Sequence, residues 1–187
     1  MTSSPTPPDV PSVGAPAPGA VAVVAGHGDF AAGLISAVAQ ITGRGELLVP
    51  ITNRGLGPGE IDAALRAAVA LSSVRVIFTD LPAGSCTIAS RRLLRERPDL
   101  RLVTGANLPA VIDYVMSAEL SPPDAAEAGR ADDASAQAVA HAVEKGRGAL
   151  VVVAPPAAPT PPATPAPVPS ALATTTAAPG PEVGGAR

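Results

Sequence analysis

Aromatic residues are scarce in this 187-residue chain, which has no tryptophan, one tyrosine and two phenylalanines. With so few aromatic side chains, the sequence lacks the stacking platforms that bind single-stranded nucleic acid. The formal net charge is only −3, so no strong basic field attracts a polyanion either. We therefore expect no nucleic-acid partner.

Cysteine is almost absent as well. The single Cys86 cannot form a disulfide within the chain, and the first residues lack the charged and apolar segments of a signal peptide. No apolar run reaches the roughly 20 residues that span a bilayer. The usual nucleotide-binding loops are missing, and no group of cysteines and histidines has the spacing of a zinc site, so no cofactor and no metal are implied. We expect a cytoplasmic protein.

Proline is concentrated at the two ends of the chain. Six of the 23 prolines lie in residues 1–19 and ten lie in residues 155–187. Segments of this composition do not pack a core. We predict a disordered leader over 1–19, one domain over 20–154 and a disordered Pro/Ala-rich tail over 155–187. The tail fits either a linker to a lost domain or a solubilising segment.

Between these ends, short apolar runs alternate with longer alanine-rich segments. The predicted strands are Val21–Ala25, Leu47–Ile51, Val74–Phe78 and Leu100–Val103. The predicted helices are Phe30–Ile41, Glu60–Leu71, Ile88–Arg97 and Leu108–Leu120. Four strand–helix units predict an α/β domain with an open, doubly wound sheet of four parallel strands flanked by helices.

The last apolar run, Ala149–Ala154, follows a segment of helical composition at Ala131–Lys145. It predicts a C-terminal antiparallel strand at an edge of the sheet. An exposed apolar edge invites pairing with another chain. Either an addition within the chain or an exchange between two subunits would cover it, and we favour a homodimer.

A histidine stands where the first predicted strand ends, since His27 lies between Gly26 and Gly28. Another predicted strand is followed by Asp80. Because the carboxyl ends of parallel strands share one rim of the sheet, we expect the two side chains to meet there. A carboxylate fixes the tautomer of an imidazole and stabilises its charged form, and neutral imidazole is a competent nucleophile. We assign His27 and Asp80 as catalytic residues, the alternative for Asp80 being a helix cap.

Small residues near this pair suggest a phosphate site. Asp29 begins a helix, and the positive end of a helix favours an incoming phosphate. At the next such helix start, the backbone amides of Gly84 and Ser85 and the Ser85 hydroxyl would hold phosphate oxygens. We assign phosphate binding to Gly28, Gly84 and Ser85.

Three other features are interpreted as structural. Cys86 lies in a first helical turn, where the dipole would activate a thiol, but no partner base is evident and we expect a packed residue. His141 lies in an alanine-rich helix and is expected to be solvated, without a role. The arginine-rich stretch from Arg91 to Arg101 is interpreted as a solvated face in preference to a docking surface.

Three segments together resemble enzyme IIA of the mannose family of bacterial sugar phosphotransferase systems, and within it the N-acetylgalactosamine/galactosamine type. They are Val23–Leu34 (VVAGHGDFAAGL), Phe78–Ser85 (FTDLPAGS) and Val103–Pro109 (VTGANLP). Their order and spacing match over about residues 20–150. One departure is the mannose-type Gly-Gly-Ser-Pro loop, which here is Ala-Gly-Ser-Cys at residues 83–86.

The resemblance implies that His27 accepts a phosphoryl group from the phosphocarrier HPr and passes it to a IIB component during sugar uptake, with Asp80 orienting the ring. It implies a phosphotransferase that uses no cofactor and associates peripherally with membrane transporter components. It also implies a homodimer with an exchanged C-terminal strand. A regulatory phosphoprotein and a phosphodonor subunit of dihydroxyacetone kinase are alternatives on the same fold.

Overall fold

A computed structural model describes residues 19–70, 73–119 and 128–153 of the chain. The strands are β1 (Ala22–Gly26), β2 (Leu48–Thr52), β3 (Val76–Thr79) and β4 (Arg101–Thr104). The helices are α1 (Phe30–Thr42), α2 (Pro58–Val69), α3 (Ser85–Glu96), α4 (Leu108–Glu119) and α5 (Ala128–Gly148), with a short 3-10 turn, η1 (Gly45–Leu47). The four predicted strand–helix units are confirmed, with shifts of a few residues at their ends.

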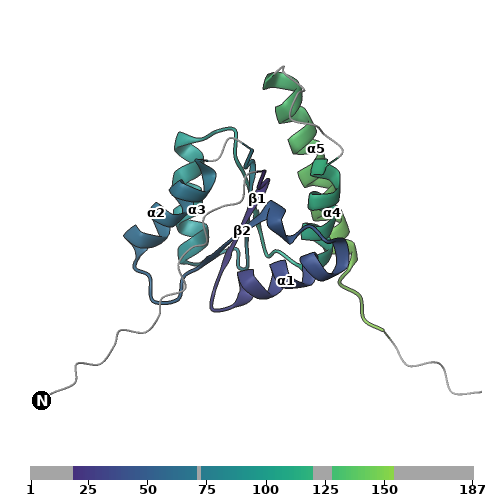
Figure 1. The fold of residues 1–187 in the computed structure, drawn as a ribbon, viewed down its shortest axis with the longest axis horizontal. Coiled ribbons are helices and arrows are strands. Elements are labelled where there is room, and N and C mark those ends of the chain that lie inside the picture. Colours follow the sequence, from purple (N-terminus) through teal and green to yellow (C-terminus); the bar gives the residue numbers. More distant parts are fainter. Residues whose placement is uncertain (1–18, 71–72, 120–127, 154–187) are drawn as a thin grey trace, which may run out of the picture. The chain divides into compact units, whose positions relative to one another are not determined.

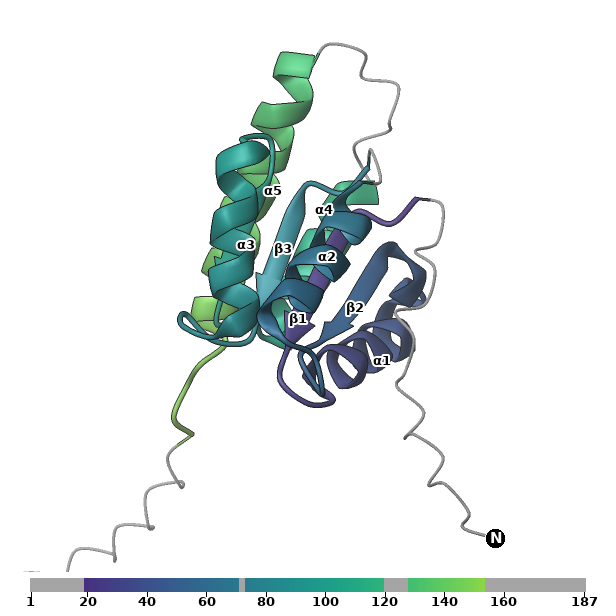
Figure 2. The same ribbon diagram turned by 90° about the vertical axis from the view of Figure 1, so that its left-hand side faces the viewer.

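The four strands form one parallel sheet in the order β2-β1-β3-β4. From β1 the chain passes through α1 to β2 on one side, and then returns through α2 to β3 on the other side of β1 (Figures 1 and 2). The winding of the chain therefore reverses between the neighbouring strands β1 and β3. In open α/β sheets such a reversal opens a crevice at the carboxyl ends of the two strands.

Helices cover both faces of the sheet, which explains why β1 is apolar throughout. Val23 and Ala25 belong to the core under α2 and α3, whereas Ala22 and Val24 belong to the core under α1, α4 and α5. This alternation is the period of two expected for side chains along a strand. Figure 2 shows α2 and α3 in front of the sheet, while Figure 1 shows α4 and α5 on its other side. All five residues of β1 are buried, as parallel strands between two helical layers must be.

The turn residues act mostly as their types predict. Gly43 ends α1 in the left-handed conformation with φ 74°, and Pro58 is the first residue of α2. Pro98 follows the end of α3 and precedes β4. Asp29 holds the N-cap position of α1, where an aspartate commonly caps the helix, but its side chain makes no capping hydrogen bond. That carboxylate instead pairs with Arg54.

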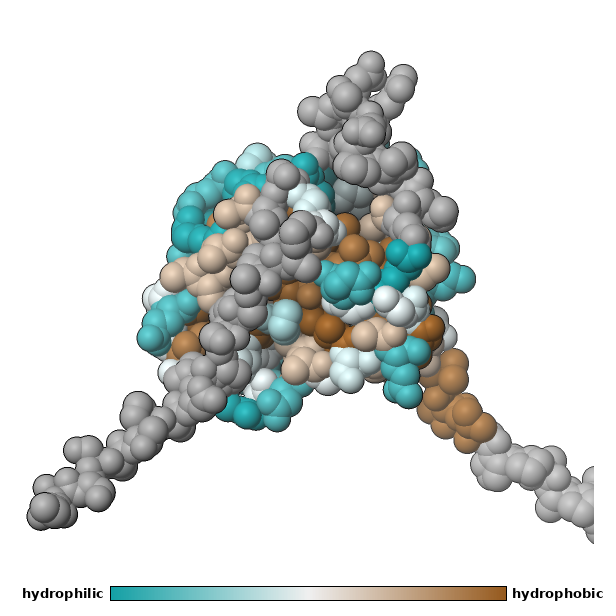
Figure 3. Space-filling model, in the orientation of Figure 1, coloured by the Kyte–Doolittle hydropathy of each residue, from teal (hydrophilic) through white to brown (hydrophobic). Residues whose placement is uncertain are grey.

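The predicted C-terminal edge strand is not seen in the part of it that the structure describes. Residues 149–153 pair with no strand, and four apolar side chains there are 74% to 98% exposed: Leu150, Val151, Val152 and Val153. Figure 3 shows this segment as a protruding apolar stretch at the lower right. Residues 149–153 therefore do not form an antiparallel strand on the sheet of their own chain. Residue 154 lies outside the described residues.

The predicted leader and tail also fall outside the described residues, apart from Gly19. None of the helices in the described part is both long enough and apolar enough to cross a membrane.

Candidate functional site

The reversal between β1 and β3 brings together the two side chains that the sequence singled out. His27 follows β1 directly, and Asp80 follows β3 directly. The backbone N–H of Asp80 donates to the carbonyl oxygen of Ala25 at 3.3 Å, which ties the end of β3 to β1. The predicted meeting of His27 and Asp80 is thus observed, because the strand order places the ends of β1 and β3 side by side.

One oxygen of Asp80 serves both donors of His27. The backbone N–H of His27 donates to Asp80 Oδ2 at 2.8 Å, and ring Nδ1 lies 2.8 Å from the same oxygen. Burial by itself would raise the pKa of Asp80, but the hydrogen bonds and charge of His27 outweigh it and lower that pKa. An ionised carboxylate only accepts hydrogen bonds, so Nδ1 carries a proton, and in the neutral form of the ring Nε2 then carries the lone pair.

The side chains of His27 and Asp80 differ in how far they are exposed to solvent. The Asp80 side chain is 13% exposed, whereas the His27 side chain is 50% exposed. The carboxylate is thus held inside the rim, and the ring presents an edge to solvent. A partner molecule can reach the ring without displacing the carboxylate.

Two glycines permit this close arrangement. A Cβ on Gly26 would lie 2.6 Å from Phe30 Cδ1 and 2.9 Å from Asp80 Oδ2, so any larger residue must displace the carboxylate. A Cβ on Gly84 would lie 3.3 Å from Cε1 of His27. Gly84 therefore lies against the exposed ring, at the N-terminus of α3. The absence of a side chain at both positions leaves room at the imidazole.

The other residues assigned to phosphate binding lie on the loops beside the ring. Gly28 adopts the left-handed conformation with φ 53° between His27 and α1. Ser85 is the first residue of α3, and its Oγ accepts a hydrogen bond from Asn53 Nδ2 at 3.3 Å. The backbone at the start of a helix favours anions, so these loops suit an incoming phosphoryl group.

The end of β2 and the loop after it are a part of the site that we did not predict. Asn53 donates from its backbone to the Gly26 carbonyl oxygen at 3.1 Å and from its side chain to Ser85. Thr52 Oγ1 donates to the Gly28 carbonyl oxygen at 2.8 Å. The only sequence signal was that polar Thr52, Asn53 and Arg54 follow a buried run, and it does not show that β2 lies beside β1.

The third segment of the resemblance, at the end of β4, has a structural role. Asn107 Oδ1 accepts from the backbone N–H of Ala110 in the first turn of α4, at 3.1 Å. Its Nδ2 donates to the carbonyl oxygen of Gly146 on α5, at 2.8 Å. A Cβ on Gly146 would lie 2.8 Å from Asn107 Oδ1, so the asparagine joins two closely packed helices.

The residues expected to be structural divide between core and surface. Cys86 is 1% exposed, and burial, followed by the charge of Asp80, raises the pKa of its thiol, which confirms a packed residue. His141 is exposed as expected, but it has a partner that we did not predict: its Nδ1 lies 2.7 Å from Asp113 Oδ2 on α4. The chain thus has a second histidine–aspartate pair.

A cavity of about 480 Å³ lies between α2 and α3, and it contains neither His27 nor Asp80. Arg66 lines it and is bound by Asp62 and Glu96. Arg92 and Arg95 also line it, and none of its lining residues is a histidine, cysteine, serine or threonine.

A comparison with protein-family models matches residues 21–131 to the EIIA-man family, described as the PTS system fructose IIA component. That range covers His27, Asp80 and all four strands. No curated protein sequence matches the chain significantly.

Solved structures agree on the fold. The mannose/sorbose-specific IIA subunit of the phosphotransferase system from Enterococcus faecalis is similar with a TM-score of 0.58 and 21% identity, over 73% of this chain and 96% of that one. The phosphotransferase system component EIIA from Streptococcus agalactiae is similar with a TM-score of 0.53 and 23% identity, over 66% of this chain and 92% of that one. The PTS IIA protein associated with the fucose utilization operon of Streptococcus pneumoniae is similar with a TM-score of 0.53 and 17% identity, over 71% of this chain and 91% of that one.

Proposed function

The chain belongs to the mannose-type IIA family of the sugar phosphotransferase system, and from this premise we propose that His27 is its phosphoryl-carrying residue. The observation that supports this most directly is the double hydrogen bond from His27 to Asp80 Oδ2, which leaves Nε2 as the free nucleophilic atom. The half-exposed ring is open to another protein. The relay accepts a phosphoryl group from the phosphocarrier HPr and hands it to a IIB component during sugar uptake.

The proposed step is an in-line displacement at phosphorus. The lone pair of His27 Nε2 forms the new N–P bond while the N–P bond of the donor phosphohistidine breaks. The departing donor nitrogen keeps that electron pair. His27 retains its proton on Nδ1, so the phosphorylated ring is cationic and its charge is balanced by ionised Asp80.

The same charge distribution supports onward transfer. The cationic phosphorylated ring leaves as a neutral imidazole, so the phosphoryl group can pass to the IIB component by a second in-line displacement. The acceptor nucleophile of the IIB component bonds to phosphorus while the Nε2–P bond breaks and its electron pair returns to Nε2. Asp80 then acts in both directions, by stabilising the ring while it carries the phosphoryl group. Gly28, Gly84 and Ser85 are proposed to bind phosphoryl oxygens through their backbone and hydroxyl groups.

The setting that we propose follows from the family. The protein would work in the cytoplasm, in peripheral contact with the membrane components of a sugar transporter. We propose the N-acetylgalactosamine/galactosamine type, because of the FTDLPAGS and VTGANLP segments. Phosphoryl transfer to a IIB component of that type, and not to a mannose-type IIB component, is the expected result.

The relay is tested by incubation with phosphoenolpyruvate, enzyme I and HPr, followed by intact mass measurement. The wild-type chain should gain one acid-labile phosphoryl group and the His27→Gln variant none. His141→Gln is the matched control, because His141 has a similar Nδ1–carboxylate contact on another part of the surface. Labelling of His27→Gln, or no labelling of the wild type, would contradict the proposal.

We also propose a homodimer, supported by the exposed apolar residues 150–153. β4 is an outer strand of the described sheet, and the segment would be covered by pairing with a partner copy.

Light scattering tests the dimer. The wild type should have a mass in solution twice that of the single chain, which is 18.3 kDa. The double variant Leu150→Asp/Val152→Asp should be monomeric. Ile41→Asp is the control, since Ile41 is an apolar side chain that is 61% exposed elsewhere. A monomeric wild type would refute the dimer.

A further inference from the structure

The loop after β2 fastens a charged side chain beside the reactive histidine. Thr52 Oγ1 donates to the carbonyl oxygen of Gly28, and the same hydroxyl oxygen accepts from the backbone N–H of Arg54 at 3.1 Å. Asn53 binds the Gly26 carbonyl oxygen. The two residues that precede Arg54 are therefore bound to the residues on both sides of His27, and the Arg54 backbone is bound to one of them.

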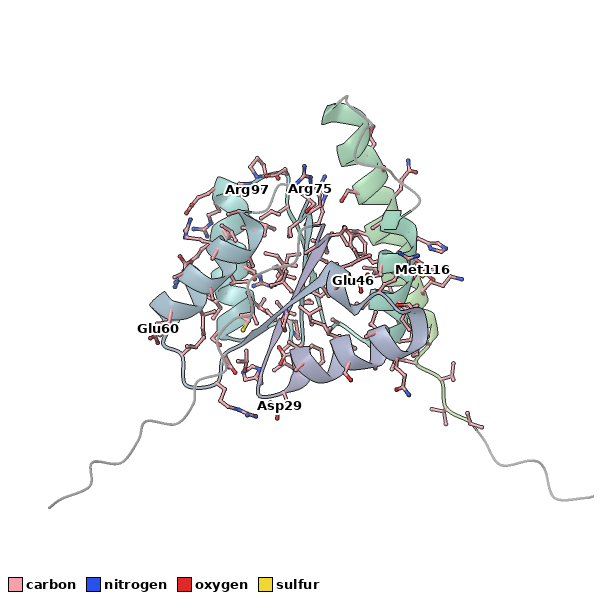
Figure 4. All side chains as sticks on the ribbon, viewed as in Figure 1. Asp29, Glu46, Glu60, Arg75, Arg97 and Met116 are labelled. Atoms are coloured by element: carbon pink, nitrogen blue, oxygen red, sulfur yellow. The ribbon has the colours of Figure 1, made fainter. Side chains whose placement is uncertain are left out.

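The Arg54 guanidinium lies close to the backbone of the histidine loop. Its Nη2 would be 3.5 Å from a Cβ placed on Gly28, and it lies 2.9 Å from Asp29 Oδ2. Figure 4 labels Asp29 at the lower end of the sheet, at the opposite end from Arg75 and Arg97. Arg54 thus brings a positive charge to the end of the molecule where the phosphoryl group would arrive.

The partner of Arg54 can be exchanged at little cost. The side chains of Arg54 and Asp29 are 56% and 80% exposed. Exposed ion pairs of this kind contribute little to stability, because water screens both charges. A phosphoryl group offers more negative charge than Asp29 and three acceptor oxygens, which a guanidinium can bind with two parallel N–H donors.

The charges at the site create a need for such a residue. Asp80 and Asp29 are two carboxylates near His27, and a phosphoryl group adds further negative charge. Asp80 is committed to the ring. We propose that Arg54 leaves Asp29 and binds the phosphoryl oxygens during transfer to and from His27; this inference rests on the proposed phosphoryl-carrier function and adds a phosphoryl-binding residue to it.

The proposal predicts opposite effects for the two partners of the ion pair. Arg54→Gln removes the positive charge and should slow phosphorylation of His27 about tenfold or more, the size expected for one charge-assisted hydrogen bond. Asp29→Asn removes the competing carboxylate and should make phosphorylation faster. If the pair only held the loop in shape, both variants would be slower.

Phosphoramidate is the donor of choice for this test, because it needs no partner protein. Its P–N bond breaks as His27 Nε2 bonds to phosphorus, and its nitrogen departs with the electron pair as ammonia. The labelling rate is followed by intact mass on the full chain. Arg54→Lys keeps a positive charge and should recover part of the rate. Arg95→Gln is the matched control, since Arg95 is an exposed arginine in the last turn of α3.

A second measurement reports on the bound phosphoryl group itself. A nearby cation lowers the pKa of the second ionisation of a phosphoryl group. The ³¹P resonance of phosphorylated Arg54→Gln should therefore titrate at higher pH than that of the phosphorylated wild type. Arg95→Gln should titrate like the wild type. A purely structural role for Arg54 would not move this titration.

The outcomes separate the two proposals. If phosphoramidate labels the wild type and HPr does not, the relay is refuted while Arg54 is still judged by the phosphoramidate rates. If Arg54→Gln is labelled as fast as the wild type, or if Asp29→Asn is slowed along with it, the role of Arg54 is refuted. If neither donor labels His27, both proposals fail.

Discussion

Asp80 Oδ2 accepts two hydrogen bonds from His27, one from its backbone N–H and one from ring Nδ1, each 2.8 Å long. The two contacts orient both the loop and the ring with a single oxygen atom. The other histidine–aspartate pair differs, because Asp113 contacts only the ring of His141 and the two residues lie on different helices. This contrast allows the chemistry of one pair to be tested against the other.

Asp80→Asn should slow phosphorylation of His27 by about a hundredfold or more, as expected when the carboxylate that fixes the tautomer of a reacting histidine is lost. An amide can donate a hydrogen bond to Nδ1, which would place the ring proton on Nε2 and remove the nucleophilic lone pair. The rate of phosphoryl transfer from HPr measures this effect. Asp113→Asn is the matched control and should leave that rate unchanged.

Gly26→Ala should lower both stability and activity. The added Cβ would approach Phe30 and the Asp80 carboxylate to less than 3 Å, and overpacking of this kind costs about 1–3 kcal/mol. Urea denaturation and the phosphorylation rate measure the two effects. Gly33→Ala provides the comparison, because nothing lies within 4 Å of a Cβ there and a helical alanine should raise stability by about 0.5–1 kcal/mol. Equal stabilities for the two variants would contradict the close contact.

Cys86 should react slowly with thiol reagents in the folded protein. Burial, together with the charge of Asp80, raises the pKa of the thiol and so reduces the reactive thiolate. Reaction with a disulfide reagent at neutral pH, with and without denaturant, measures this protection. Cys86→Ala should still be phosphorylated, and loss of phosphorylation in a folded Cys86→Ala protein would assign the thiol a role in the chemistry.

Acid should destabilise the protein partly through Asp80. Burial opposes the hydrogen bonds of His27, but the net effect lowers the pKa of Asp80 in the folded protein. The unfolded chain, where an aspartate titrates near pH 4, therefore binds the proton more readily. Stability conferred by this carboxylate is present above about pH 4 and is lost as the pH falls through the folded pKa.

Urea denaturation over this acid range tests the expectation. Asp80→Asn should show a shallower loss of stability below about pH 4 than the wild type. Asp99→Asn should also reduce the loss of stability in acid, because the hydrogen bond of Arg97 lowers the pKa of Asp99. Only Asp80→Asn should also impair phosphorylation. If Asp80→Asn lost stability in acid as steeply as the wild type, folding would not lower the pKa of Asp80.

Much of the fold could be predicted because its signals are local. Alternating buried runs such as Val21–Ala25, together with Gly43, Pro58 and Pro98 at the ends of helices, mark the strand–helix units from sequence spacing alone. His27 and Asp80 could be paired because parallel strands end at one rim. The edge strand at Ala149–Ala154 could not be located in the same way, since an apolar run specifies burial without specifying which surface covers it.

The contribution of the loop after β2 required the tertiary structure. Thr52, Asn53 and Arg54 carry no motif, and their importance comes from the position of β2 beside β1. Contacts such as Thr52 to Gly28 or Asn53 to Ser85 join residues that are 24 and 32 positions apart. Sequence periodicity extends over one helix or strand and cannot specify such distances.

By itself, the sequence determined the strand–helix units and the meeting of His27 with Asp80, because hydrophobic period, turn residues and strand ends are properties of neighbouring positions. Only the tertiary structure decided which oxygen binds His27, why Gly26 admits no side chain, and that Arg54 lies beside Gly28. These features depend on strand order and on packing at distances of 3–4 Å.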